Sequence, residues 1–291
     1  MTANQYLPSS YIETVWRLAV GITPVSALGG APPLPWVRLA LERVPKPHPV
    51  PAGAGAIGNY DVGIGLPTVA RNDAGRFAIT YSLPGLNSPV AVRLYDIARR
   101  YVPRRFRLPV PDQAAVVAEE QAAEQPPWPP IPSRAVRPVL YPGANWGTQA
   151  GATAVRGRVL RADGSVARWT RVSAVDADHG FPVGWAHGDD RGEFLLVLTS
   201  SGAGLFTPGS GLAHVTLTVS ARPVPATIDS PAQSRADPLW DLEVEALPSP
   251  GSADTVSDGR TPPADYSESA TATLRFVKGA VSSPRQPFVV S

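Results

Sequence analysis

The sequence predicts a mainly β fold, with two β-sandwiches joined by a short helical and Pro-rich linker. First, 34 Pro and 26 Gly make up 60 of the 291 residues, more than long helices tolerate, because Pro costs roughly 3 kcal/mol inside a helix. Second, apolar and polar residues alternate in many short runs, which is the period of a half-buried strand. Third, the two halves of the chain share one turn-and-strand motif. The length suits two domains that each bury a core.

The first half contains short alternating runs separated by turn residues. Gly and Pro at 29–33 indicate a turn, and the Pro- and Gly-rich residues 45–70 indicate a long loop. The expected strands lie at residues 16–20, 36–42, 76–82, 90–94 and 106–110.

The composition changes between residues 111 and 133. Residues 113–124 favour a helix, and Asp112 is placed to accept a hydrogen bond at its N-terminus. Residues 125–130, which are mostly Pro, end the helix and favour polyproline II. We therefore expect 111–133 to link the two domains.

The second half again favours strands. Asp163-Gly164 between two alternating runs predicts a hairpin, and residues 248–268 predict a long loop. In the run 240–245, Trp, Leu and Val alternate with acidic residues, so we expect a buried apolar face and a solvated acidic face. The expected strands lie at residues 155–160, 169–175, 193–198, 214–219, 240–245, 271–277 and 288–290. The expected division is an arm at 1–14, a sandwich at 15–110, the linker at 111–133, a sandwich at 134–247 and a loop with a C-terminal arm at 248–291.

A motif recurs in the two halves. Trp36 and Trp169 each open a strand, and each half then has an acidic turn that ends in Gly and is followed two residues later by Phe. These pairs are Gly75 with Phe77 and Gly192 with Phe194. Asp or Asn can cap such a turn, Gly supplies a positive φ, and Phe anchors the strand in a core.

The order of these motifs in the second half resembles a known family. A V-x-G-x-V strand, an Asp-Gly turn, an aromatic-led strand and a D-D-x-G-x-F-x-L strand follow one another over residues 153–222. This order is similar to that of carboxypeptidase regulatory-like domains. The resemblance implies a transthyretin-like β-sandwich, related in architecture to immunoglobulin-like sandwiches, that serves as a non-catalytic folding, spacing or binding module. The first half departs from the opening phrase at residues 19–22.

Composition excludes several classes of protein. The absence of Cys excludes disulfides, thiol catalysis and Cys-ligated zinc. The 26 cationic residues exceed the 24 acidic ones by two, a balance that does not favour nucleic acid as a partner. No apolar run approaches the ~18 residues of a membrane span, and no signal peptide is apparent, so we expect synthesis in the cytoplasm.

Three chemical motifs are weak. Residues 53–58 match G-x-G-x-x-G, but Pro residues precede them and no helix follows, so a loop is expected rather than a nucleotide site. Acidic residues and His between 176 and 190 are typical of turns as well as of metal sites. The four His accompany no G-x-S-x-G motif. We therefore predict no catalytic, metal-binding or cofactor-binding residues.

A dense basic run with interleaved aromatic residues is the first candidate site. It could contact phosphates, form a solvated face or dock an acidic partner. The Trp in the Pro-rich linker could anchor the same interface. The candidate interface consists of Arg99, Arg100, Tyr101, Arg104, Arg105, Phe106, Arg107 and Trp128.

A candidate ligand-binding loop is formed by Trp146, Trp185 and His187. Aromatic rings of this kind suit a carbohydrate or a peptide.

The leading functional hypothesis is a non-enzymatic structural or adaptor subunit of a larger, oligomeric protein assembly. A narrower version is a cap or accessory component of a phage-tail-like contractile injection particle, which could be released from the cell. The alternative is a soluble carbohydrate- or peptide-binding β-sandwich module. A hydrolase is the third hypothesis.

Overall fold

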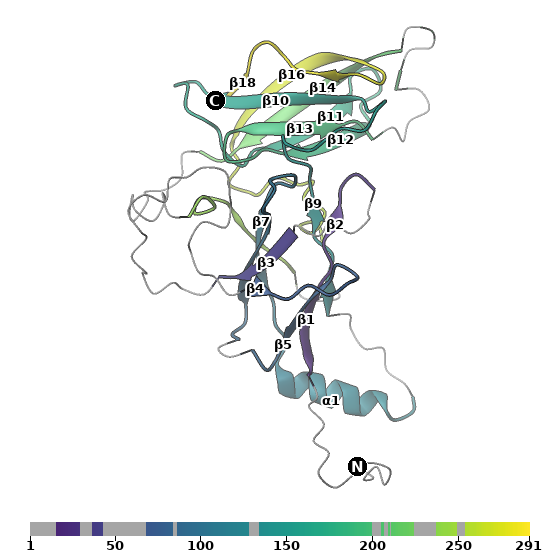
Figure 1. Ribbon diagram of the computed structural model, residues 1–291, viewed down its shortest axis with the longest axis vertical. Coiled ribbons are helices and arrows are strands. Elements are labelled where there is room, and N and C mark those ends of the chain that lie inside the picture. The colour runs from purple at the N-terminus through teal and green to yellow at the C-terminus, as the bar shows by residue number, and fades with distance from the viewer. Residues whose placement is uncertain are drawn as a thin grey trace.

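The computed structural model describes residues 16–29, 37–42, 68–83, 86–127, 134–199, 205–206, 209, 211–223, 237–248 and 254–291. Their strands form two β units, which lie one above the other along the long axis of the molecule (Figure 1). Each unit packs two sheets around its own buried core, as a β-sandwich does. The prediction of a mainly β protein is confirmed. The expected arm at 1–14, the motif at 53–58, Trp36 and Trp128 lie outside the described residues.

The lower β unit contains ten strands of the described chain. One sheet has the order β5-β1-β8, continued by the parallel pair β2-β9, and the facing sheet has the order β15-β7-β6-β3-β4. The strands are β1 (Leu18–Ile22), β2 (Val25–Ser26), β3 (Val37–Leu41), β4 (Thr68–Val69), β5 (Phe77–Thr80), β6 (Val90–Asp96), β7 (Arg104–Leu108), β8 (Ala135–Val136), β9 (Val139–Leu140) and β15 (Val244–Ala246).

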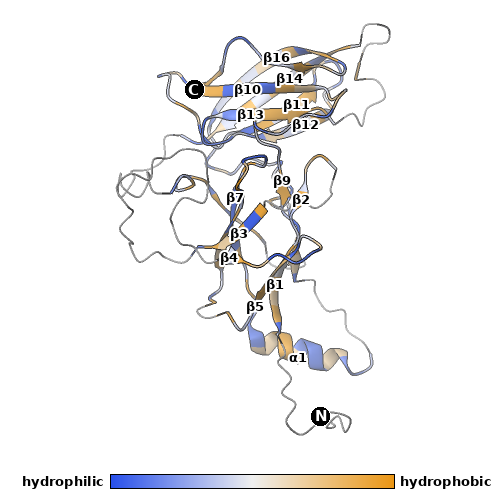
Figure 2. Ribbon diagram, in the orientation of Figure 1, coloured by the Kyte–Doolittle hydropathy of each residue, from blue (hydrophilic) through white to orange (hydrophobic). Residues whose placement is uncertain are grey.

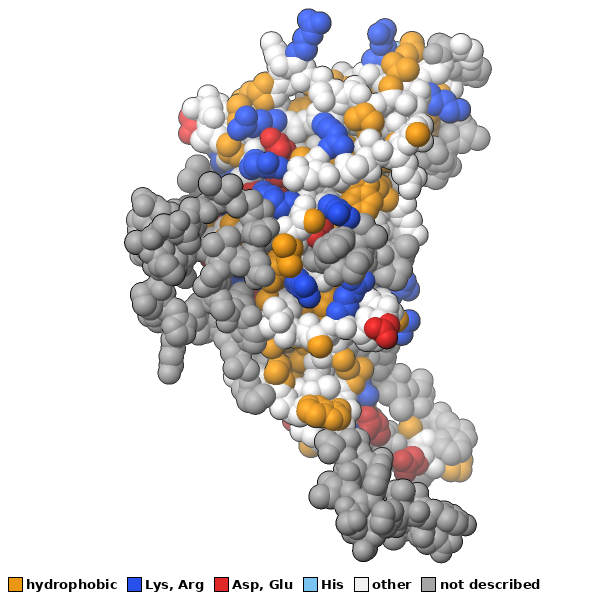
Figure 3. All heavy atoms as spheres, viewed as in Figure 1, with side chains coloured by type: hydrophobic (Ala, Val, Ile, Leu, Met, Phe, Trp, Pro, Cys, Tyr) orange, Lys and Arg blue, Asp and Glu red, His pale blue; other side chains and the backbone are white. Residues whose placement is uncertain are grey.

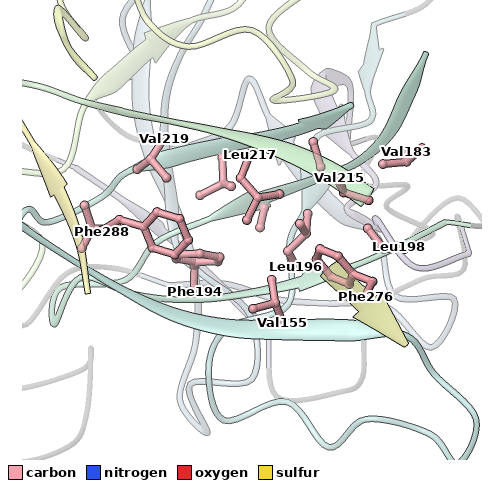
Figure 4. Close-up of a cluster of buried hydrophobic side chains, with 14 of the residues drawn as sticks. Val155, Val183, Phe194, Leu196, Leu198, Val215, Leu217, Val219, Phe276 and Phe288 are labelled. Carbon is pink, nitrogen blue, oxygen red and sulfur yellow. The ribbon is translucent and has the colours of Figure 1, made fainter. Parts of the chain in front are cut away.

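The upper β unit has a sheet β12-β11-β14-β16 that faces a sheet in which β10 pairs with β13, β17 and β18. Its strands are β10 (Ala154–Arg161), β11 (Arg171–Asp176), β12 (Pro182–His187), β13 (Glu193–Val197), β14 (Leu212–Ala221), β16 (Glu268–Val277), β17 (Val281–Ser282) and β18 (Phe288–Val290). Phe194, Phe276 and Phe288 fill its core together with Val and Leu from both sheets (Figure 4).

The expected division at residues 134 and 247 needs correction. The segment that contains β8 and β9 belongs to the lower unit, because it forms a parallel ladder with β1 and β2. In this ladder the Gly21 N–H donates to the Arg134 carbonyl at 2.9 Å, and the Ala27 N–H donates to the Leu140 carbonyl at 3.0 Å. β15 also belongs to the lower unit, where it pairs in parallel with β7.

The predicted helix is present as α1 (Gln113–Ala123), and the Asp112 carboxylate accepts a hydrogen bond from the Ala115 N–H at 3.1 Å. It does not join the two units. The strands before and after it, β7 and β8, both belong to the lower unit, and α1 lies at the end far from the upper unit (Figure 1). α1 mixes hydrophilic and hydrophobic residues (Figure 2), and only Val116 is buried.

The repeated turn works in both units as its sequence indicates. Gly75 and Gly192 have positive φ angles of 78° and 69°, which favour Gly over other residues. The side chain of Asn72 accepts from the Arg76 N–H at 2.8 Å, and that of Asp189 accepts from the Glu193 N–H at 3.0 Å. The Phe that follows each Gly is buried.

Gly157 on β10 tests how tightly the upper core is packed. A Cβ at this position would lie 2.3 Å from the Phe194 ring. We therefore expect Gly157→Ala to lower the free energy of unfolding by about 1–3 kcal/mol, because overpacking forces neighbouring groups to shift. Urea denaturation measures the change. Gly147→Ala is the control, since nothing lies within 4 Å of its Cβ position, and equal stabilities of the two variants would contradict the prediction.

Candidate functional site: the contact between the two β units

Apolar side chains from both units meet where the units touch. Trp169 precedes β11 in the upper unit and is buried in a cluster with Tyr95 and Val102 of the lower unit. Leu239 and Leu242, from the segment that leads into β15, and Ala40 on β3 also belong to this cluster. The buried Trp169 indole N–H keeps a hydrogen-bond partner, because it donates to the Asp241 carboxylate at 2.7 Å.

A buried carboxylate between two guanidinium groups lies beside this cluster. Glu245 on β15 accepts two hydrogen bonds from Arg104 on β7, at 2.9 and 2.7 Å. It also accepts one from Arg171 on β11, at 3.2 Å. Because β7 and β15 belong to the lower unit and β11 to the upper unit, this triad joins the two units. Its side chains are at most 5% exposed.

Arg104 also joins segments that are distant in sequence. Its side chain donates to the carbonyl oxygens of Val139 and Ser257, both at 2.9 Å, and to that of Val256 at 2.6 Å. A planar guanidinium presents five N–H donors, so one side chain satisfies carbonyl groups of strand β9 and of the loop at 256–257 as well as the carboxylate. Arg104 is fully buried and depends on these partners, because an unpaired charge in such a place is costly.

The protonation of the triad follows from its geometry. Burial alone would raise the pKa of Glu245, but Arg104 and Arg171 outweigh burial and hold the pKa below its ordinary value. The carboxylate is therefore charged in the folded protein. By the described contacts, the triad combines two positive charges with one negative charge.

His187 on β12 borders the triad. Its ring stacks on Tyr141 with centroids 4.1 Å apart, and its Nε2–H donates to the Gly259 carbonyl at 2.7 Å. Complete burial, with Arg171 and Arg104 nearby, lowers the pKa of His187 well below its ordinary value. His187 is therefore neutral. Gly259 has a φ of +66°, and a Cβ there would lie 2.9 Å from the His187 ring. The loop that contains Gly259 therefore needs Gly at this position to lie so close to His187.

A second ionic contact crosses between the units. Arg99, in the turn between β6 and β7, pairs with Asp190 and lies 3.8 Å from the Asp189 carboxylate. Both acids belong to the turn that precedes β13. Arg99 has a positive φ of 55°, a conformation that costs free energy for a non-Gly residue. The turn is thus held in a shape that directs Arg99 toward the upper unit.

The basic run of the candidate interface lies largely inside the chain. Tyr101 and Phe106 are buried in the lower core. Arg105 forms two hydrogen bonds with the Glu42 carboxylate, at 2.6 and 2.8 Å. Arg100 is half-buried, and Arg107 is the exposed member of the run on β7. The expectation of a free basic surface is therefore corrected, because Arg99 and Arg104 hold together two parts of the same chain.

The three residues of the candidate ligand loop lie in different surroundings. Trp146 is half-buried against Tyr101, with ring centroids 4.8 Å apart. Trp185 carries the Arg260 guanidinium on its ring, 4.3 Å from the centroid. His187 is completely buried at the triad. Each of the three rings therefore contacts another side chain of the same protein.

Sequence reasoning missed Glu245 and Arg171, which complete the site. Within the described residues, no group of three or more His, Asp or Glu is arranged to hold a metal ion. The acidic turns instead cap backbone groups, as Asp176 does by accepting from the Asp178 N–H at 3.1 Å. The arrangement is suited to fixing the geometry between two β units.

No family model and no curated protein matches the chain. Among solved structures, the Bacillus anthracis TIE protein is similar with a TM-score of 0.24 and 7% identity, over 93% of this chain and 34% of that one. The chain thus spans a third of that protein. The shaft pilin SpaA from Lactobacillus rhamnosus GG has a TM-score of 0.22 and 12% identity, over 95% and 97% of the two chains. A streptococcal ancillary pilin has the same score and identity, over 75% and 58%. Scores at this level assign neither fold nor function.

No helix in the described part of the chain has both the length and the apolar character needed to cross a membrane.

The triad predicts a large effect of Glu245→Gln. We expect the variant to lose about 3–5 kcal/mol of unfolding free energy, because two buried cations lose their counter-charge. A carboxylate with a lowered pKa stabilises the fold above its unfolded pKa, so the difference from wild type should shrink as the pH falls below 4.5. Chemical denaturation at several pH values measures both effects.

The control for this prediction is Glu193→Gln, whose partner Arg191 is 45% exposed. An exposed pair contributes at most about 1 kcal/mol. A Glu245→Gln variant that is no less stable than this control would show that the triad does not hold the units together.

His187 predicts a second pH effect, of the same sign. The unfolded chain takes up a proton at His187 below pH 6.5, whereas the folded chain does not. Wild-type stability should therefore fall below pH 6.5 more steeply than that of His187→Gln, by up to about 1.4 kcal/mol per pH unit. Thermal melting between pH 7 and pH 5 tests this, with His214→Gln at an exposed position of β14 as the control. Parallel profiles of wild type and His187→Gln would contradict it.

Proposed function

We propose that the chain is a non-enzymatic structural subunit that holds two β units in one fixed orientation within a larger assembly. The observation that carries this proposal is the Arg104–Glu245–Arg171 triad, which lies buried between the units. Contacts between domains that move relative to each other are usually polar and open to water. Here the contact is buried, with aromatic and aliphatic side chains at one side and an ionic triad at the other.

The chemistry of the contact supports this role over a catalytic one. A buried ion group gives little net stability compared with apolar side chains of similar size, but it requires one geometry to avoid unpaired charge. Glu245 binds both guanidinium groups, and Arg104 also donates to backbone carbonyls. Such an arrangement fixes an orientation, which is what a spacer or adaptor has to provide.

The narrower hypotheses belong to this proposal and remain predictions. The resemblance of residues 153–222 to carboxypeptidase regulatory-like domains would make the upper unit a transthyretin-like spacer. A cap or accessory role in a contractile injection particle is one form that the assembly could take. Each is consistent with a subunit that is elongated (Figure 1).

The proposal predicts how the native protein behaves in its own host. After gentle lysis and a sucrose gradient, we expect it to sediment with large particles that negative-stain microscopy shows to be regular assemblies. A subunit that sediments alone near 30.6 kDa at its native concentration would contradict the proposal. A high-salt wash of the particles is the control, because exposed ionic contacts with a partner weaken with salt whereas the buried triad does not.

A further inference from the structure

The free edge of β16 forms one tip of the molecule. β16 is ten residues long and pairs with β14 over its whole length, as the last strand of the sheet β12-β11-β14-β16. Figure 1 places β16 at the end of the upper unit that faces away from the lower unit. A strand in this position can accept another strand along its open side.

The backbone of β16 is available on that side. The Lys278 N–H donates to Gly211 next to β14, whereas the Ser269 N–H donates outward to the Ser291 carbonyl at 3.3 Å. Backbone groups alternate along a strand, so the N–H and C=O groups of Thr271, Thr273 and Arg275 also point outward. Among the described residues, no backbone group pairs with them.

This edge lacks several of the features that usually protect an open strand, although it carries the charged residues Glu268 and Arg275. The ten residues of β16 include no Pro and no Lys, and their register with β14 runs without a bulge. Proteins commonly block an open edge with such features to prevent association. Ser291 covers the edge at Ser269, but from Thr271 to Arg275 the edge is regular and is suited to pairing with another strand.

The core of the upper unit is also open along this edge. Ala270, Ala272 and Leu274 of β16 point toward the core and pack against it, yet each is only half-buried. Val277, at the C-terminal end of β16, is a further exposed hydrophobic residue, at 48% exposure. An added strand with apolar residues on its core side would cover part of this surface.

The charge at the tip is positive. Arg275 and Lys278 are exposed and form no ion pair with the described residues. The acids at the opposite end of the strand are already paired, since Glu268 binds Arg161 at 3.1 Å and Asp265 binds Arg222 at 2.9 Å. Lys and Arg side chains also mark the upper end of the molecule in Figure 3. An acidic ligand would therefore meet unpaired cations.

We propose that the edge of β16 binds an extended segment of a partner protein as an added strand, with apolar residues on its core side and acidic residues on its outer side. Backbone hydrogen bonds to Thr271, Thr273 and Arg275 would supply affinity, and the alternating side chains would supply specificity. A second copy of the chain fits less well, because its β16 would bring another Arg275 to this edge. The inference rests on the proposed function and names how the subunit would join its assembly.

The test uses a fluorescein-labelled heptapeptide with blocked ends, in which valine alternates with aspartate. Fluorescence anisotropy should show saturable binding to the full chain. Thr273→Pro should weaken binding at least about tenfold, because it removes an outward N–H, and Arg275→Glu should do the same by reversing a charge. Since the Thr273 N–H points away from β14, Pro leaves the β14 ladder intact. Arg275→Glu tests the edge independently of any effect of Pro on folding.

Two matched controls make the result specific. Arg158→Glu makes the same charge change at an exposed position of β10, in the opposite sheet, and should leave binding unchanged. A peptide in which lysine replaces aspartate should bind at least about tenfold more weakly. Absence of saturable binding, or equal binding of the two peptides, would overturn the inference. A wild-type dimer that Thr273→Pro abolishes in analytical ultracentrifugation would overturn it in favour of a second copy.

Failure of this inference can be separated from failure of the proposed function. Peptide binding reports on the tip alone, whereas co-sedimentation reports on the assembly. If the chain sediments with particles but does not bind the peptide, the inference is overturned and the structural role stands. If it binds the peptide but sediments alone at its native concentration, the structural role is overturned.

Discussion

The bidentate pair between Arg104 and Glu245 is the interaction on which the rest of the structure depends. It joins β7 to β15, and through Arg171 it reaches β11 of the other unit. Charges buried this deeply are tolerated only when each has partners in the right places. Strand β9, which contains Val139, and the loop that contains Val256 and Ser257 must therefore lie where their carbonyl groups accept from Arg104. One residue thus constrains four separate parts of the chain.

The preference of this protein for Arg over Lys has a structural use. Only two of its 26 cations are Lys, and the buried cations at the contact are all Arg. Arg93 binds Asp237 with two hydrogen bonds, at 2.8 and 2.9 Å, in the same bidentate way as Arg104 binds Glu245. A Lys ammonium has three donors and no planar fork, so it could not replace either residue with the same geometry. Whatever the origin of the composition, the contact between the units depends on guanidinium groups.

Much of the local structure could be predicted from the sequence, because it depends on neighbouring residues. Asp112 caps α1, and Gly75 and Gly192 shape their turns, as expected. The site could not be predicted in the same way. The alternation in residues 240–245 indicates a solvated acidic face, yet Glu245 is buried, because Arg104, 141 residues away in sequence, is its partner. A period-2 pattern shows that the two faces of a strand differ in polarity. It does not show whether the charged face lies in water or is buried against residues of opposite charge.

The same limit explains the predicted linker and the candidate interface. Parallel pairing of β8 with β1 joins residues that are far apart in sequence, and no local signal marks it, so residues 111–133 looked like a connection between domains. The basic run from Arg99 to Arg107 stands out in the sequence as the densest group of cations. Its partners, such as Asp190 and Glu42, lie in other strands and turns of the same chain, which sequence spacing does not reveal.

The crossing of the chain between the units has a consequence for how the protein is made. In the lower unit, β7 lacks its partner β15 until residues 244–246 are synthesised. In the upper unit, β10 lacks its partner β18 until residues 288–290 are synthesised. Neither unit can close while the ribosome is still making the middle of the chain. Both units therefore complete their sheets late, and until then their open strand edges are exposed to association with other chains.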